Sequence, residues 1–369
     1  MQHKAIHTEA IDNGLDRQSL NQLQKRFLKI NSGRLARTRS ALSDRQQTFL
    51  DILPLLFHVN HPMLPGYVSR TAPAGICSFQ PEQKDIDLGR SLARSFCLHR
   101  DPMVRLQIEG LYLMGSVGTL AHSDKSDFDI WVCYTPGLEP QAVAELNQKC
   151  GHIAAWAKSL RLDVHFFPMD YNAFKQGKSS TLDEESSGSA QHLLLLDEFY
   201  RTALHLAGRL PLWWFVPPAA EKGYQTFADT LLHRRFMSSS KVLDFGGISA
   251  IPSGEFLGAG IWQLYKAIES PYKSVLKLLL LEAYVGQQPQ LEPLSLIYKQ
   301  KIYDGQLDID ELDPYIMIYR RIEVYLAQQK QLRRLELARR CLYFKINKPL
   351  SKPFSGKQKS WQRKLLERL

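Results

Sequence analysis

The spacing of apolar residues predicts helices at the beginning of the chain. Apolar positions recur every three or four residues in three stretches, and the first stretch ends at Ser32-Gly33, which is typical of a helix end. The expected helices cover residues 16–33, 43–57 and 81–99. A stretch rich in Pro and Gly separates the second and third and predicts an ordered loop. We therefore predict a mostly helical segment over residues 1–103.

The pattern changes to strand-like alternation in the middle of the chain. The expected strands cover residues 106–114, 127–134 and 162–169, where aromatic and β-branched residues are common. The expected helices of this part cover residues 138–160 and 189–207, and "LPLWWFVP" after the second indicates a short strand. This order predicts a compact α/β unit over residues 104–217.

From residue 218 onward the pattern is nearly all helical. The expected helices cover residues 221–237, 254–270, 272–286 and 314–345. Pro271 and Pro293 mark boundaries between these helices, because proline interrupts a helix. The fold class is therefore α+β, a small mixed sheet flanked by N-terminal helices and by a C-terminal helical domain over residues 218–369. The last residues form a basic amphipathic stretch without a natural stop, and we expect the protein to continue beyond it.

Composition excludes several classes of protein. No apolar run approaches the roughly 20 residues of a membrane-spanning helix, and the first residues lack the apolar core of a signal peptide. The 5 cysteines are widely spaced and form no metal-type pair, which favours reduced thiols and a cytoplasmic location.

The positive charge is concentrated at one end of the chain. The net charge is +10, but residues 330–369 carry 13 Lys and Arg against two Glu, so the rest of the chain sums to −1. A general nucleic-acid-binding face is therefore not indicated, and we expect no nucleic-acid partner. A solvated helical face is the simplest interpretation of the basic end.

Two aspartates open the second expected strand and suggest a metal site. Because alternate side chains of a strand share a face, Asp127 and Asp129 point the same way, and two such carboxylates repel each other unless a cation lies between them. Asp163 lies near the start of the third strand and can lie beside them, although Asp127 or Asp163 could instead cap the turn before its strand. Three carboxylates could hold two Mg²⁺ ions, with a triphosphate supplying further oxygen ligands.

Gly115 and Ser116 follow the first expected strand. Glycine there lets the backbone approach a ligand closely, and free N–H groups and the Ser116 hydroxyl can contact phosphate oxygens. Gly-Ser alone is uninformative, but Gly-Ser after one strand and Asp-x-Asp at the start of the next is a specific combination.

This combination resembles the polymerase-β-like nucleotidyltransferase superfamily. Further segments, including "HPMLPGY", "SAQHLLLLDEFYRTALHLAGR" and "GIWQLYKAIESPYKSVLKLLLLEAY", are similar to the catalytic half of γ-proteobacterial class I adenylate cyclases from about residue 40 to about residue 345. Relatives can carry Glu at the position of Asp163, and some carry hydroxyl residues where this chain has Val117-Gly118. The first difference preserves a carboxylate but alters its reach. The second affects side-chain contacts from the loop and not the carboxylate chemistry.

The resemblance implies a lyase that converts ATP into 3′,5′-cyclic AMP and pyrophosphate in bacterial signalling. It implies Mg²⁺, with Mn²⁺ as a possible substitute, at Asp127, Asp129 and Asp163, and regulatory partners that act through a C-terminal region absent here. We expect Lys266 and Lys273 to reach the triphosphate, because helical domains of the superfamily often supply lysines, although each could equally be a surface lysine.

Two weaker candidates complete the expected substrate site. His192 begins an apolar helix and could contact the substrate, but a capping or core role is equally compatible with its position. Asp244 precedes two glycines and could belong to a loop near the nucleotide.

Two other functions remain open at this point. The same motif serves enzymes that transfer a nucleotidyl group to a hydroxyl of a protein, an RNA or a small molecule. A catalytically inactive nucleotide-binding module is the second alternative, but such modules typically lose one of the three carboxylates. The resemblance outside the motif favours cyclisation.

Overall fold

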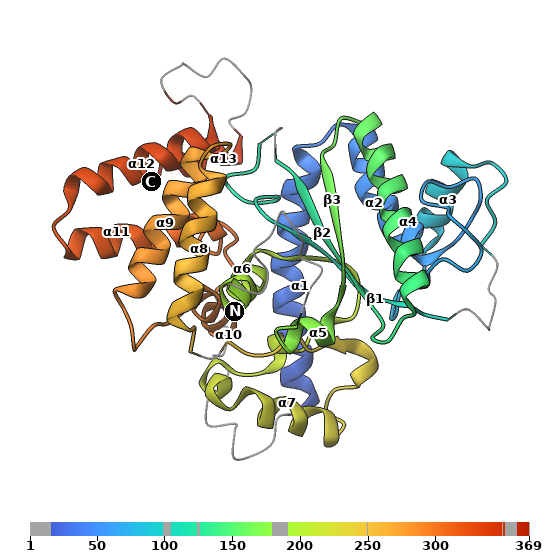
Figure 1. The fold of residues 1–369 in the computed structure, drawn as a ribbon, viewed down its shortest axis with the longest axis horizontal. Helices are drawn as coiled ribbons and strands as arrows, with labels where there is room; N and C mark the ends of the chain where they lie inside the picture. Colours follow the sequence, from blue (N-terminus) through green and yellow to red (C-terminus); the bar gives the residue numbers. More distant parts are fainter. Residues whose placement is uncertain are drawn as a thin grey trace.

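A four-stranded sheet lies at the centre of the molecule, in the order β3-β2-β1-β4 (Figure 1). Its strands are β1 (Ile108–Met114), β2 (Phe128–Tyr134), β3 (Val164–Asp170) and β4 (Leu204–Gly208). β2 and β3 are parallel, whereas β1 is antiparallel to both β2 and β4. This mixed sheet confirms the predicted α+β class. The computed structural model describes residues 16–98, 105–123, 126–178, 191–248, 250–348, 350 and 360–368.

The two faces of the sheet contribute to two separate cores. Ile130 and Val164 point into the core that contains α2 (Asp44–His58) and α4 (Pro140–Ser159). Trp131 and Met169 point into the opposite core, formed with α1 (Arg17–Ser40), α6 (His192–Thr202) and the C-terminal helices. Figure 1 shows the sheet between these two groups of helices. The helix α4 supplies the crossover that the parallel strands β2 and β3 require.

The C-terminal helices contribute buried residues to the core that also contains Trp131 and Met169. They are α7 (Tyr224–His233), α8 (Ser253–Lys266), α9 (Pro271–Val285), α10 (Leu294–Tyr303), α11 (Pro314–Gln328), α12 (Leu332–Ile346) and α13 (Trp361–Leu366). The helix α9 packs against α8, α11 and α12. Arginines of the basic end form ion pairs here, including Arg334 with Glu282 and Arg339 with Glu323. These two ion pairs link α12 to α9 and to α11.

The predicted end of the first helix at Ser32-Gly33 is wrong, because α1 continues to Ser40. A glycine inside a helix costs about 1 kcal/mol relative to alanine, which tertiary packing readily offsets. Here a Cβ on Gly33 would lie 3.3 Å from Ile309, so the missing side chain allows close packing between distant segments. The third predicted helix is shorter than expected, since α3 spans Gln83–Leu92, and residue 99 lies outside the described residues.

Two other predicted helices are interrupted. The helix expected over 189–207 ends at Thr202, and the following residues form β4 because they pair with the edge of β1. The helix expected over 314–345 is two helices, separated at a turn where Lys330 has a positive φ of 55°. In the first case strand pairing with β1 overrides the helical pattern. In the second case the break allows α12 to pack against α11 and α9.

Smaller elements complete the chain. "LPLWWFVP" contains the two-residue strand β5 (Leu210–Pro211), paired with β6 (Val242–Leu243), and then the 3-10 helix η3 (Leu212–Phe215). The helix α10 was not predicted. The predicted boundary at 103–104 lies outside the described residues, as do residues 189 and 190, and the domain limits stay predictions. Within the described ranges, none of the helices combines the length and apolarity needed to cross a bilayer.

Candidate active site

The predicted carboxylates lie where β2 and β3 begin. Phe128 is opposite Val164 in the parallel register, and the Phe128 N–H donates to the Asp163 carbonyl oxygen at 2.8 Å. Asp127 and Asp163 therefore precede their strands at the same level, and neighbouring strands are only about 4.8 Å apart. Asp129 lies one step along β2, opposite His165.

The three carboxylates differ in exposure. The side chain of Asp163 is 74% exposed and lies 3.3 Å from His165 Nε2, and Asp127 is also exposed. Asp129 is partly buried, and this burial raises its pKa, against the effect of Lys273. The neighbouring charge of Asp127 raises that pKa further. The site thus concentrates negative charge, as expected of a group that binds a cation.

Gly115 and Ser116 adjoin this charge. β1 ends with Met114 opposite Asp129, and Gly115 follows with a positive φ of 87°. A Cβ on Gly115 would lie 3.5 Å from Asp129 Oδ2, so the backbone passes directly beside the carboxylate. The Ser116 hydroxyl is 3.1 Å from the hydroxyl of Ser126, which immediately precedes Asp127. The two ends of the connection between β1 and β2 are therefore joined at the site.

Lys273 is the predicted lysine that the structure brings to the carboxylates. It projects from the first turn of α9, and its pKa is raised by the neighbouring Tyr315 and, against the effect of burial, by Glu198, Asp129 and Asp127. The site therefore contains a cation from the helical part of the chain opposite carboxylates from the sheet.

A second lysine, Lys345 of α12, was not found from the sequence. Its pKa is lowered by burial and by the neighbouring charge of Lys273, while Asp127 acts in the opposite direction. The rings of Tyr272 and Phe344 are stacked with centroids 5.1 Å apart. Lys273 and Lys345, which directly follow them in the sequence, therefore lie on adjoining helices. No sequence pattern marks Lys345, because its place depends on how α12 packs against α9.

The structure does not bring Lys266 or Asp244 into this group. Lys266 Nζ lies 5.2 Å from the ring centroid of Trp262 and 3.7 Å from Glu269, both close to it in sequence. Asp244 accepts hydrogen bonds from Lys175 at 2.5 Å and from Tyr224 at 2.8 Å. Lys175 follows the far end of β3, so Asp244 lies at the opposite end of the sheet from Asp163.

His192 lies at the end of α6 that is farther from the carboxylates. It begins α6, and its ring centroid is 4.7 Å from that of Phe174, in the short helix α5 (Tyr171–Lys175). Glu198, whose charge acts on Asp129, lies about 9 Å further along the axis of α6. Burial lowers the pKa of His192, which favours its neutral form.

The donor set of the carboxylates fits a hard divalent cation. Asp127, Asp129 and Asp163 offer oxygen ligands at one end of the sheet, two of them exposed to solvent. Among the residues that the structure describes, no three Asp, Glu, His or Cys side chains converge into a ready-made cage. Mg²⁺ commonly takes one or two carboxylates and completes its shell with water and substrate phosphates, so the residues present suffice.

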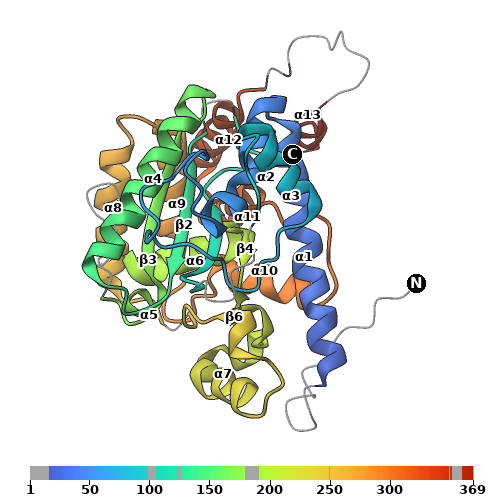
Figure 2. The same cartoon turned by 90° about the vertical axis from the view of Figure 1, so that its right-hand side faces the viewer.

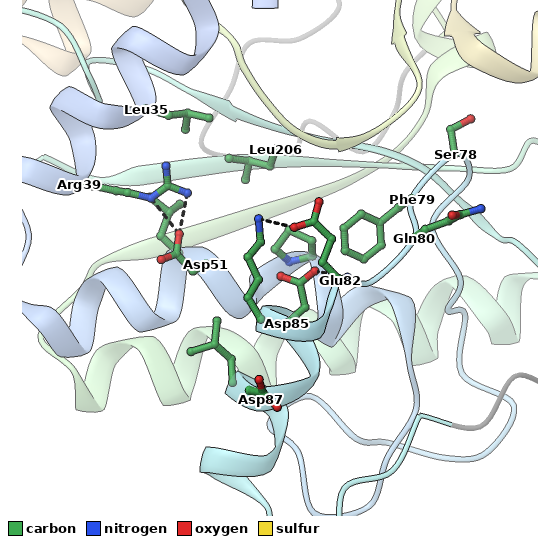
Figure 3. A pocket seen from close by; sticks show the side chains of 14 residues that line it. Leu35, Arg39, Asp51, Ser78, Phe79, Gln80, Glu82, Asp85, Asp87 and Leu206 are labelled. Atoms are coloured by element: carbon green, nitrogen blue, oxygen red, sulfur yellow. Dashed lines mark hydrogen bonds and ion pairs between the residues drawn. The ribbon is translucent and has the colours of Figure 1, made fainter.

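Another concave region lies away from these residues. A groove of about 980 Å³ runs between α1, α2 and α3 and is lined by ion pairs, including Arg39 with Asp51 (Figure 3). None of the predicted site residues lines it.

Comparison with known proteins gives consistent matches. Residues 19–214 match the family described as the adenylate cyclase NT domain, and residues 251–369 match the class-I adenylate cyclase second domain. The adenylate cyclase of Escherichia coli strain K12 is 40% identical over 349 residues, which are 94% of this chain and 41% of that protein. The adenylate cyclases of Proteus mirabilis and Yersinia intermedia are 39% and 38% identical, with the same coverage.

The chain thus spans about two fifths of the length of the curated relatives that it matches. No solved structure matches it. The two family matches together cover most of the chain, and the strand-loop-strand arrangement of Gly115, Ser116, Asp127 and Asp129 lies within the first of them. On these findings, the chain belongs to the class-I adenylate cyclase family.

Proposed function

We propose that this chain carries the catalytic site of an adenylate cyclase, which converts ATP into 3′,5′-cyclic AMP and pyrophosphate. The observation that carries the proposal is the position of Gly115 and Lys273 beside Asp129, in a chain of the class-I adenylate cyclase family. Sheet carboxylates and helix lysines together suit a ligand that combines a metal ion with a triphosphate.

Asp127, Asp129 and Asp163 would hold Mg²⁺, two ions with Mn²⁺ as a possible substitute. Such metal ions, when bound, neutralise phosphate charge and make a coordinated hydroxyl more acidic. In this proposal Asp127 and Asp129 act as shared ligands. The exposed carboxylate of Asp163 is also suited to accept the proton of the ribose 3′-hydroxyl.

Lys273 and Lys345 are proposed to bind the triphosphate. Burial lowers the pKa of Lys345, and repulsion by the neighbouring Lys273 lowers it further. Phosphate oxygens between them would remove the repulsion and replace the water lost on burial. Ser116 and the adjoining backbone N–H groups would contact the phosphate from the other side.

Cyclisation is mainly a positioning task for these groups. The ribose 3′-oxygen forms a bond to the α-phosphorus of the same molecule, the bond from that phosphorus to pyrophosphate breaks, and the proton leaves the 3′-oxygen. Holding the ribose above its own α-phosphate supplies much of the rate enhancement, because the reacting atoms need no further collision. Contacts from two sides of the nucleotide serve that purpose.

The wider setting is part of the same proposal. We also propose a cytoplasmic location for the chain, because its substrate in this proposal is ATP. Regulatory partners are proposed to act through a C-terminal region, beyond the part of the longer relatives that this chain matches.

The proposal is tested by incubating the chain with ATP and Mg²⁺ and identifying the products by mass. Cyclic AMP and pyrophosphate are expected, together with their loss in Asp129→Asn. An adenylylated acceptor would support nucleotidyl transfer instead. Unchanged ATP, also with a chain of the relatives' full length, would support an inactive nucleotide-binding module.

A further inference from the structure

The connection between β1 and β2 is held by residues from distant parts of the chain. Asp313, at the start of α11, accepts a hydrogen bond from the Leu120 N–H at 2.7 Å. On another side, Gly118 packs against α1, where a Cβ would lie 2.7 Å from the carbonyl oxygen of Arg34. We call residues 116–123 the site loop, since it begins at Ser116 beside the carboxylates.

Gln362 of α13 holds the same loop from a third side. Its Nε2 donates to the carbonyl oxygens of Leu120 at 3.0 Å and of His122 at 2.9 Å. Gln362 is buried, so its amide hydrogens satisfy loop carbonyls that lie out of reach of bulk water. These contacts join residues more than 200 positions apart, and they act on the backbone of the site loop itself.

The helix α13 is anchored to α1 and to the main core. The guanidinium of Arg37 lies 4.0 Å above the ring of Trp361. Leu365 and Leu366 are buried in the core cluster that also contains Leu120. Figure 2 shows α13 beside α1.

A helix as short as α13 depends on its contacts. It has only 6 residues, whereas isolated helices shorter than about 12 residues are marginal in water. Its presence therefore depends on docking against α1 and the site loop. In turn, the shape of the site loop depends on that docking, because the Leu120 and His122 carbonyls lose a buried partner when α13 leaves.

We propose that α13 is a latch for the site loop and that Gln362 is a positioning residue that holds Ser116 and the backbone after it in the conformation that binds the nucleotide phosphates. The functional part of this inference rests on the proposed cyclase activity, while the latch itself does not. Gln362 touches no reacting atom in this proposal, and it acts through the site loop.

The test compares Gln362→Glu with the parent chain. Glutamate has nearly the same shape as glutamine, but its carboxylate has only hydrogen-bond acceptors. It therefore repels the two loop carbonyl oxygens to which the glutamine amide donates. Gln362→Arg keeps N–H donors and serves as the rescue variant. Lys364→Gln changes an exposed residue of the same helix and serves as the matched control.

Amide hydrogen exchange, followed by mass spectrometry, reports the latch without any need for activity. In Gln362→Glu, exchange in residues 117–123 should rise about tenfold, as expected when buried hydrogen bonds are lost, while β2 and α4 keep their protection. Gln362→Arg and Lys364→Gln should resemble the parent. Unchanged exchange of the site loop in Gln362→Glu would overturn the latch, and Gln362→Leu repeats the test without an added charge.

Kinetics test the positioning role separately. The KM for ATP should rise about tenfold in Gln362→Glu with kcat nearly unchanged, and Gln362→Arg should restore it, because ground-state binding is what the site loop supplies. Faster loop exchange with unchanged KM would overturn the positioning role. Absence of cyclic AMP from both the parent chain and a chain of the relatives' full length would reject the proposed function, whereas the exchange result would still decide the latch.

Discussion

Lys277 and Glu198 form an ion pair between α9 and α6, with Nζ 2.8 Å from Oε2. Lys273 lies one helical turn earlier on α9, and its charge also favours the ionised form of Glu198. Burial alone would raise the pKa of Glu198, but Lys277, Arg201 and Lys273 outweigh burial and lower it to about 2. The ion pair therefore orients the helix that presents Lys273 to the sheet.

This ion pair predicts an acid-sensitive contribution to stability. Because the pKa of Glu198 is lower in the folded chain, its stabilising effect is present above its ordinary pKa of 4.5 and is lost as the pH falls towards 2. Glu198→Gln should therefore destabilise the chain at pH 7, and the difference from the parent should shrink below pH 4.5. Urea denaturation across this range measures both effects.

Glu336→Gln is the matched control, because it removes an exposed ion pair with Arg340. Such surface pairs contribute about 0.5 kcal/mol or less, so the control should lie close to the parent. A constant difference between Glu198→Gln and the parent at every pH would contradict the role assigned to the pair.

Asp129→Asn is expected to separate catalysis from folding. Asparagine has the same shape but cannot supply the charge that holds a cation, so turnover should fall by at least about a hundredfold. Burial already disfavours the charge of Asp129, and the melting temperature should therefore stay the same or rise. Near-normal formation of cyclic AMP by this variant would remove Asp129 from the proposed mechanism.

Gly115→Ala should impair activity more than its cost in stability explains. At a positive φ of 87°, alanine costs about 1 kcal/mol in backbone strain, and its Cβ would adjoin the Asp129 carboxylate. Gly137→Ala is a suitable comparison, because Gly137 has a φ of 80° but no atom within 4 Å of a Cβ.

Thermal denaturation should show similar losses for the two alanine variants. Only Gly115→Ala should lose activity in the cyclase assay. Equal activity of the two would show that the space beside Asp129 is not required.

The burial of Lys149 implies that the stability of the folded chain increases with pH. It is buried on α4, and its Nζ donates to the Val59 carbonyl at 3.1 Å and to Asn60 Oδ1 at 2.9 Å. Burial lowers its pKa from 10.5 to about 7, so the unfolded chain binds more protons between these values. The free energy of unfolding should therefore rise across that range.

Lys149→Met should abolish most of this rise. Denaturation in urea at pH 7 and pH 10 measures it. Lys158→Met, which changes an exposed lysine on the same helix, should keep the dependence of the parent. The same pH dependence in Lys149→Met as in the parent would show that Lys149 stays charged in the folded chain.

Features that depend on residues close together in the chain could be predicted from the sequence. Alternation of side chains marked β1, β2 and β3, and Asp127 and Asp129 were found because residues two apart share a strand face. The family resemblance indicated Lys273, which the structure brings to these carboxylates. The metal and substrate roles of these residues stay predictions.

Features that depend on long-range contacts could not be predicted from the sequence. β4 exists because it pairs with β1, and Lys345 reaches the site because α12 packs against α9. Gln362 is an ordinary polar residue in the sequence, yet its amide lies against the site loop. Apolar periodicity reports which face of an element is buried but not which element covers it, so these partners could emerge only from the folded chain.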